Sequence, residues 1–231
     1  MNRRSNLAHA LARALLPVSA AVFLSAAFAA DPQPHVRGTI VSFAADQLVV
    51  QTKEGNRTFS LQPATRIAGV VPSSLDQIKS GTYVGIANVP GADVSSALEV
   101  VVFPEAMKGA GLGDYAWDLA PPASAGGARS SAMTNGTVKS SATPSGVATT
   151  SAMTNGTVKA TSGSKEVVLT VDYGKGEKKI TVQPGVPVVG ILPGDRGKLV
   201  PGAHVFIAPN ADAPTTASFV AVGIDGTVPP M

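Results

Sequence analysis

Tyr115 and Trp117 are the side chains with the clearest capacity to bind a ligand in this chain of 231 residues. Trp117 is the only tryptophan, and Met107 precedes the pair in a glycine-rich stretch. Aromatic side chains on a loop often anchor a ligand or a partner protein. We predict that Met107, Tyr115 and Trp117 form a binding surface. The alternative is that the two aromatic rings close the open end of a barrel as a lid.

Metal-binding side chains are few. Beyond residue 30 the chain has two histidines, His35 and His204, which form no HxH or HxxxH pair, and it has no cysteine at all. A mononuclear site usually needs three or four ligands from histidine, cysteine or carboxylate side chains. We therefore predict no metal site. Asp114, Asp118 and His204 are the weak candidates that remain if a metal does bind.

Catalytic patterns are also missing from the sequence. No GxSxG motif occurs, and no histidine lies near a serine-containing turn to act as its base. The acidic residues are scattered, so no pair of carboxylates suits acid and base catalysis. GAGLG at residues 109–113 lacks the spacing of a phosphate-binding GxGxxG loop. We predict that the protein is not an enzyme and carries no cofactor.

Residues 1–30 have the order of a secretory signal peptide. Arginines precede an apolar run at residues 15–28, which ends in small residues. We predict cleavage after Ala29 or Ala30 and a periplasmic or secreted mature protein. The alternative is a membrane anchor, but about 14 apolar residues are fewer than the roughly 20 that span a bilayer. No later segment is apolar enough, so we expect no stable membrane insertion after cleavage.

Charge argues against nucleic acid as a partner. The chain has 18 basic and 15 acidic residues, and three of the basic residues lie in the predicted signal. The predicted mature chain therefore has 15 residues of each sign. A neutral protein has no long-range field that would attract phosphate groups.

An internal repeat organises the rest of the chain. GTIVSF at residues 38–43 returns as GTVKAT at residues 156–161, and residues 57–87 match residues 178–208 with a shift of 121 and no gap. Self-similarity of this kind indicates one structural unit built twice. We predict two domains, at residues 36–103 and 156–226.

Each unit has short stretches with the two-residue period of strands. Small all-β domains with many short strands remove exposed edges by closing into a barrel. We predict an all-β chain of two tandem small OB-like barrels, with an open sandwich as the alternative. The expected core of the first barrel is Ile40, Leu48, Val50, Phe59, Leu61, Ile67, Val84, Ile86, Val100 and Val102.

One short helical turn is expected within residues 72–81, where Ser73 can cap the first turn. The matching residues 193–202 contain glycines that make a helical turn less favourable.

A connector at residues 104–155 separates the units, and we expect it to be partly flexible. Within it, SAMTNGTVK occurs twice, at residues 131–139 and 151–159. We predict that the second copy forms the first strand of the second barrel because it continues directly into that unit. Residues 137–140 of the first copy would then be loose.

The chain resembles a family of exported bacterial proteins built from small β-barrel units and classed as a domain of unknown function. The resemblance rests on the unit beginning GTIV, ALEVVVFPEAMKGAGLGDYAWDL at residues 97–119, the MTNGTV that follows, and the runs EKKITV, PGDR and PGAHVF. It implies export in a Gram-negative bacterium and brings no established catalytic residues. Relatives often carry the label "metal ABC transporter permease". The copy at residues 131–150 departs from the family pattern.

These observations predict an exported, non-enzymatic binding or interaction module. Its partner in the periplasm would be a protein or a small ligand that the sequence does not identify. The alternative is an accessory or metal-binding protein that works beside a metal ABC transporter, without being a membrane-spanning permease.

Overall fold

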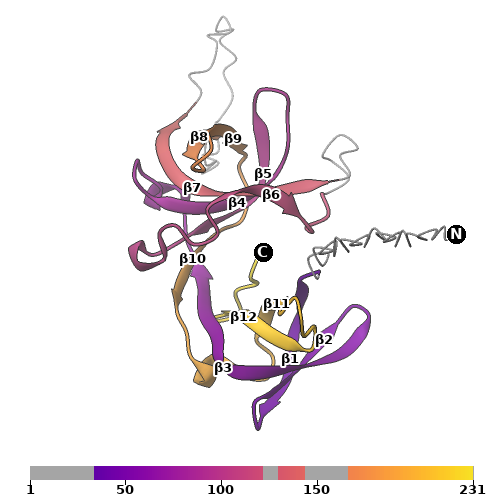
Figure 1. Cartoon of the computed structure of the whole chain (residues 1–231). Coiled ribbons are helices and arrows are strands. Elements are labelled where there is room, and N and C mark those ends of the chain that lie inside the picture. Colours follow the sequence, from indigo (N-terminus) through magenta and orange to yellow (C-terminus); the bar gives the residue numbers. More distant parts are fainter. Residues whose placement is uncertain (1–33, 122–129, 144–165, 231) are drawn as a thin grey trace, which may run out of the picture. The chain divides into compact units, whose positions relative to one another are not determined.

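The computed structural model describes residues 34–121, 130–143 and 166–230. All of them belong to one compact unit, Pro32–Met231. They form strands and three short 3₁₀ turns, without an α-helix (Figure 1). In these ranges no helix has the length and apolar character needed to cross a bilayer. The predicted signal, residues 1–30, and the second SAMTNGTVK copy lie outside the described residues.

Five strands close into a mixed barrel, which confirms the all-β class and the prediction of a small barrel. They are β1 (Val36–Ala44), β2 (Gln47–Thr52), β3 (Gly55–Pro72), β11 (His204–Pro209) and β12 (Thr216–Gly223). Neighbours in the ring pair antiparallel, except that β12 runs parallel to β3. The barrel therefore combines strands from both ends of the chain.

Seven further strands complete the fold. They are β4 (Tyr83–Val89), β5 (Ser95–Val102), β6 (Gly113–Trp117), β7 (Ser131–Ala142), β8 (Val167–Asp172), β9 (Glu177–Val182) and β10 (Val188–Pro193). Five of them pair in the order β5-β4-β7-β8-β9, and we call this group the second sheet. Its ends, β5 and β9, meet through two parallel residue pairs.

The two repeats exchange their C-terminal halves. β1 to β3 of the first repeat pair with β11 and β12 of the second, while β4 and β5 of the first repeat pair with strands of the second sheet. The tandem arrangement expected from the sequence, in which each repeat pairs only with itself, is therefore wrong. This is domain swapping within one chain.

The exchange also divides the predicted core. The first five predicted core residues, from Ile40 to Leu61, pack in the barrel with Val205 and Ile207. Val84, Ile86 and Val100 pack instead in the second sheet, against strands of the other repeat. The residues were correctly predicted to be buried or half-buried, but they belong to two cores.

Strand β3 connects the barrel with strand β10, which lies outside it. The sequence suggested only short strands, but β3 is continuous over 18 residues. At about 3.3 Å per residue it is roughly 60 Å long, too long for one small barrel. Its second half pairs with β12 of the barrel along one edge and antiparallel with β10 along the other (Figure 1).

The pairing of β3 with β10 has local two-fold symmetry. Val70 lies opposite Ile191, and these residues are 121 positions apart, which is the shift of the repeat. Gly69 pairs with Leu192 and Val71 with Gly190, so each segment contacts its own counterpart. Such self-complementary contact is the geometry of a two-fold dimer interface.

Glycine begins both repeats because another strand passes close to it. A Cβ atom on Gly38 would lie 2.2 Å from the carbonyl oxygen of Gln51, and a Cβ atom on Gly136 would lie 2.2 Å from that of Asp172. No side chain fits at that distance. Gly136 belongs to the first SAMTNGTVK copy, so this copy, and not the second, is the described counterpart of β1.

The prediction that residues 137–140 are loose is therefore wrong. They lie in β7, and Val138 is fully buried in the core of the second sheet. Its backbone N–H donates to the carbonyl oxygen of Thr82 at 2.8 Å.

Three single turns of 3₁₀ helix connect strands: η1 (Leu75–Gln77), η2 (Glu105–Met107) and η3 (Arg196–Lys198). The turn η1 confirms the short helical turn expected there, but no side chain caps it. The cap occurs in the second repeat instead, where Asp195 accepts a hydrogen bond from the backbone N–H of Gly197 at 2.7 Å. A single 3₁₀ turn tolerates the glycine that would weaken a longer helix.

Candidate binding site

The connector adds a strand that breaks the symmetry of the two repeats. Strand β6 pairs along β7, with Gly113 opposite Asn135 and Trp117 opposite Ser131. Two strands, β6 and β7, lie in the described part of the connector, which was expected to be partly flexible. Strand β6 carries Tyr115 and Trp117, so both aromatic side chains are fixed by a sheet.

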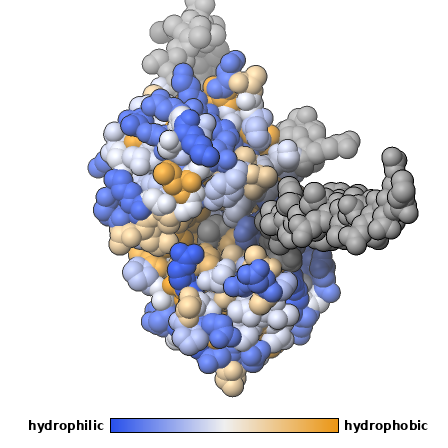
Figure 2. All heavy atoms as spheres, viewed as in Figure 1, coloured by the Kyte–Doolittle hydropathy of each residue, from blue (hydrophilic) through white to orange (hydrophobic). Residues whose placement is uncertain are grey.

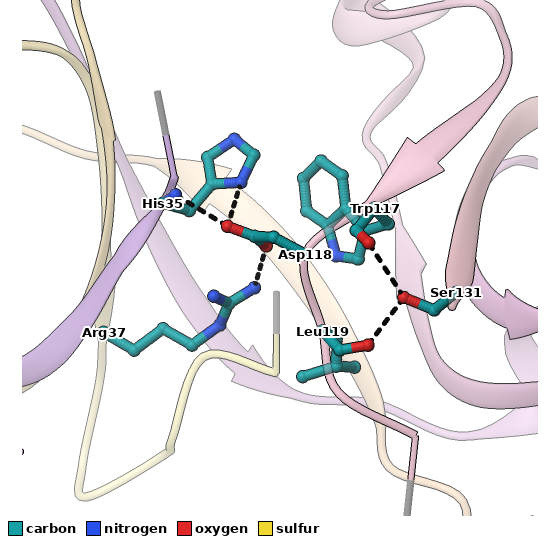
Figure 3. Close-up of polar contacts among 6 residues, drawn as sticks. All are labelled: His35, Arg37, Trp117, Asp118, Leu119 and Ser131. Atoms are coloured by element: carbon teal, nitrogen blue, oxygen red, sulfur yellow. Dashed lines mark hydrogen bonds and ion pairs between the residues drawn. The ribbon is translucent and has the colours of Figure 1, made fainter. Parts of the chain in front are cut away.

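Buried polar side chains of β7 hold β6 and the residues after it. The hydroxyl of Ser131 donates to the carbonyl oxygens of Trp117 at 3.2 Å and Leu119 at 2.6 Å (Figure 3). Thr134 donates through its hydroxyl to Asp114 Oδ1 at 2.7 Å. The small polar residues that resemble a linker in the sequence are therefore the hydrogen-bonding groups of a buried strand.

Trp117 lies in a stack of rings that joins β6 to the barrel. Its ring centroid is 4.4 Å from that of His35 and 6.1 Å from that of Phe206. His35 itself stacks on Phe206 at 4.8 Å. Trp117 is half-buried and packs against the apolar cluster between the barrel and the second sheet.

Asp118 forms hydrogen bonds with His35 and Arg37 at the start of β1. Its Oδ2 accepts a hydrogen bond from the backbone N–H of His35 at 2.7 Å and lies 3.0 Å from His35 Nδ1. Its Oδ1 accepts from Arg37 at 2.8 Å (Figure 3). Burial favours a higher pKa for Asp118, but the hydrogen bonds from His35 and Arg37 outweigh it and hold the pKa well below its usual range.

A cavity of about 640 Å³ lies beside this stack, and we call it the aromatic cavity. Met107, Tyr115 and Trp117, the three residues proposed from the sequence as a binding surface, all line it. Its other walls include Phe103, Phe206 and Phe219. Cavities that bind small molecules usually measure about 300 to 1,000 Å³ and are mostly apolar.

Asn135 forms part of the same lining and was not identified from the sequence. It is 7% exposed, and its Nδ2 donates to the carbonyl oxygen of Gly111 at 3.1 Å and to the hydroxyl oxygen of Tyr115 at 2.9 Å. Gly85 provides the space, because a Cβ atom there would lie 2.5 Å from Asn135 Oδ1. The repeat places Phe206 at the position equivalent to Gly85.

Two residues of the lining carry buried polar atoms without a hydrogen-bond partner. They are Trp117 Nε1 and Asn135 Oδ1, two of four such atoms in the described part of the chain. An unpaired buried polar atom costs about 1 to 3 kcal/mol. Two such atoms in one wall indicate a site that is not optimised for stability alone.

The weak metal candidates from the sequence do not lie together. Asp114 binds Lys178, whose Nζ lies 2.9 Å and 3.1 Å from the two carboxylate oxygens. Asp118 binds His35 and Arg37, and His204 Nδ1 lies 3.3 Å from the hydroxyl of Thr39. Within the described ranges, no three potential metal ligands form a group.

A second apolar space of about 610 Å³, which we call the adjoining groove, shares part of its lining with the aromatic cavity. Both linings include Arg66, Met107, Ala110 and Phe219. Leu192, which is 47% exposed, lines the groove alone. Figure 2 shows hydrophobic residues gathered in a band across the middle of the viewed face.

Comparison of the chain with protein-family models, with curated proteins and with solved structures finds no match.

Proposed function

We propose that this protein is an exported, non-enzymatic binding module whose ligand occupies the aromatic cavity. The observation that carries the proposal is the cavity of about 640 Å³ beside the only tryptophan of the chain. Its walls come from the barrel, the second sheet and β6, so the ligand would contact both halves of the fold.

The chemistry of the lining favours binding over catalysis. Three ionisable side chains, His35, Arg66 and Tyr115, belong to it. His35 packs against the rings of Trp117 and Phe206 and directs Nδ1 toward Asp118, which leaves it poorly placed to move to a substrate. Most of the remaining lining is apolar or aromatic, which suits a ligand that binds by burying apolar surface.

The neutral fluorophore N-phenyl-1-naphthylamine tests this proposal. We expect one molecule to bind per chain, with a rise in its emission and energy transfer from Trp117. Trp117→Phe should abolish the transfer while binding persists, because a phenyl ring maintains an apolar wall. Isothermal titration calorimetry gives the stoichiometry without relying on fluorescence.

A cavity-filling variant gives the matched control. Ala110 lines both the cavity and the adjoining groove, so Ala110→Phe should block the space and weaken binding at least about tenfold. Ala92→Phe makes the same change at an exposed loop position and should leave binding unchanged. Equal binding by both variants, or no binding by the wild-type protein, would contradict the proposed function.

A further inference from the structure

We propose that the ligand is an anionic amphiphile: an alkyl chain that lies in the aromatic cavity and adjoining groove, with a negatively charged head group on Arg66. This inference rests on the proposed function and specifies its ligand. It follows from the charge of the two linings and from the way in which the spaces join.

The linings of the two spaces carry positive charge and no carboxylate. Arg66 belongs to both linings and Lys108 to the groove, while no aspartate or glutamate of the described residues lines either space. An apolar space with cationic groups and no anionic ones is complementary to an anion with an apolar body.

Arg66 is more available than Lys108 to bind an anionic head group. Lys108 Nζ already lies 3.2 Å from Glu105 Oε1. Arg66 is exposed, its guanidinium carbon lies 5.9 Å from the centroid of the Phe219 ring, and it takes no part in the ion pairs among the described residues. A guanidinium held over an aromatic ring keeps its N–H donors free for a carboxylate or a phosphate.

The junction of the spaces favours an elongated body. Arg66 lies where the aromatic cavity and the groove meet, beside Met107 and Phe219. A compact ring system would fill one space and leave the other empty. A flexible chain can follow the apolar walls through both, and the thioether side chain of Met107 adapts to such a ligand.

Displacement of N-phenyl-1-naphthylamine by single-chain probes tests the head group. Laurate and dodecyl phosphate carry the proposed charge, dodecanol is neutral, and dodecyltrimethylammonium is cationic. We expect at least one of the two anions to displace the fluorophore at a concentration at least about tenfold lower than the other two require. The more effective anion identifies the preferred head group.

Arg66→Gln should remove this preference and weaken the binding of the anion about tenfold, while dodecanol binds as before. Arg57→Gln is the matched control: Arg57 lies on the same strand with its guanidinium carbon 5.1 Å from the Phe59 ring centroid, but it lines neither space. It should retain the preference.

The outcomes separate this inference from the proposed function. If the fluorophore binds but the anions have no advantage, or if Arg66→Gln leaves their advantage intact, the anionic ligand is refuted and the binding module stands. If the fluorophore itself does not bind in the cavity, the proposed function fails first.

Discussion

Val138→Asp should unfold the second sheet, and it should destabilise the protein more than Val158→Asp does. The two valines occupy the same position in identical nonapeptides. Val138 is fully buried in β7, and Val158 lies outside the described residues. A carboxylate at position 138 would be buried without a partner, which costs several kcal/mol.

Urea denaturation followed by circular dichroism measures both variants. Equal and severe loss in Val158→Asp would show that the second copy is also required for the fold. If each single variant is stable and only the double variant unfolds, either copy can form β7. The first outcome would contradict the expected difference between the two variants, and the second would contradict the assignment of the strand to residues 131–142.

Glu99→Gln should stabilise the protein at alkaline pH, by up to about 5 kcal/mol. Glu99 is 3% exposed on β5, and its Oε1 has no hydrogen-bond partner. Burial raises the pKa of Glu99 from 4.5 to about 8, with Asp118 adding to the rise and Arg37 opposing it. The folded protein therefore favours the neutral carboxyl group.

The sign of the pH dependence follows from this shift. Glu99 costs the fold nothing below its unfolded pKa of 4.5. Stability is then lost as pH rises toward the folded pKa of about 8, beyond which the loss is constant. Glutamine stays neutral, so the variant should gain relative to the wild-type protein between pH 5 and pH 9.

Denaturation curves at pH 5, 7 and 9 measure this gain. Glu54→Gln makes the same substitution in an exposed turn and should give a curve parallel to that of the wild-type protein. If Glu99→Gln is also parallel, Glu99 is charged in the folded state and the inferred burial effect is wrong.

Local patterns in the sequence predicted which residues are buried. Phe59 and Leu61 alternate with polar neighbours, as expected for a strand with one buried face, and both are almost fully buried. The all-β class follows from the same alternation.

The partner of each strand could not be predicted in the same way. The repeat makes His204 the counterpart of Tyr83, so β1 could pair with β11 or with β4 by nearly the same contacts. The length of β3 decides between them, and that length depends on residues 62–65 remaining extended. Short-range periodicity carries no information on that choice.

The candidate site was partly visible in the sequence. Met107, Tyr115 and Trp117 stood out by residue type, and the structure places them around one cavity. His35 and Asn135 were missed because each belongs to a stretch whose composition is typical of a flexible segment. Both residues acquire their role only from tertiary contacts. His35 packs against aromatic rings, and Asn135 fits beside Gly85, which has no side chain.

The most direct test of this account is a disulfide between the exchanged halves. Thr39 and His204 lie opposite each other on β1 and β11, and opposite residues of antiparallel strands have Cα atoms about 4.5 to 5.5 Å apart, within the range of a disulfide. The chain has no cysteine, so an engineered pair has no competitor.

Peptide mapping by mass spectrometry after oxidation of the dilute protein gives the result. The account predicts an intramolecular disulfide in the variant Thr39→Cys with His204→Cys, and none in the variant Thr39→Cys with Tyr83→Cys. A disulfide in the second variant alone would show two tandem barrels, and one that joins two chains would show exchange between molecules. Either result would contradict the fold on which the aromatic cavity depends.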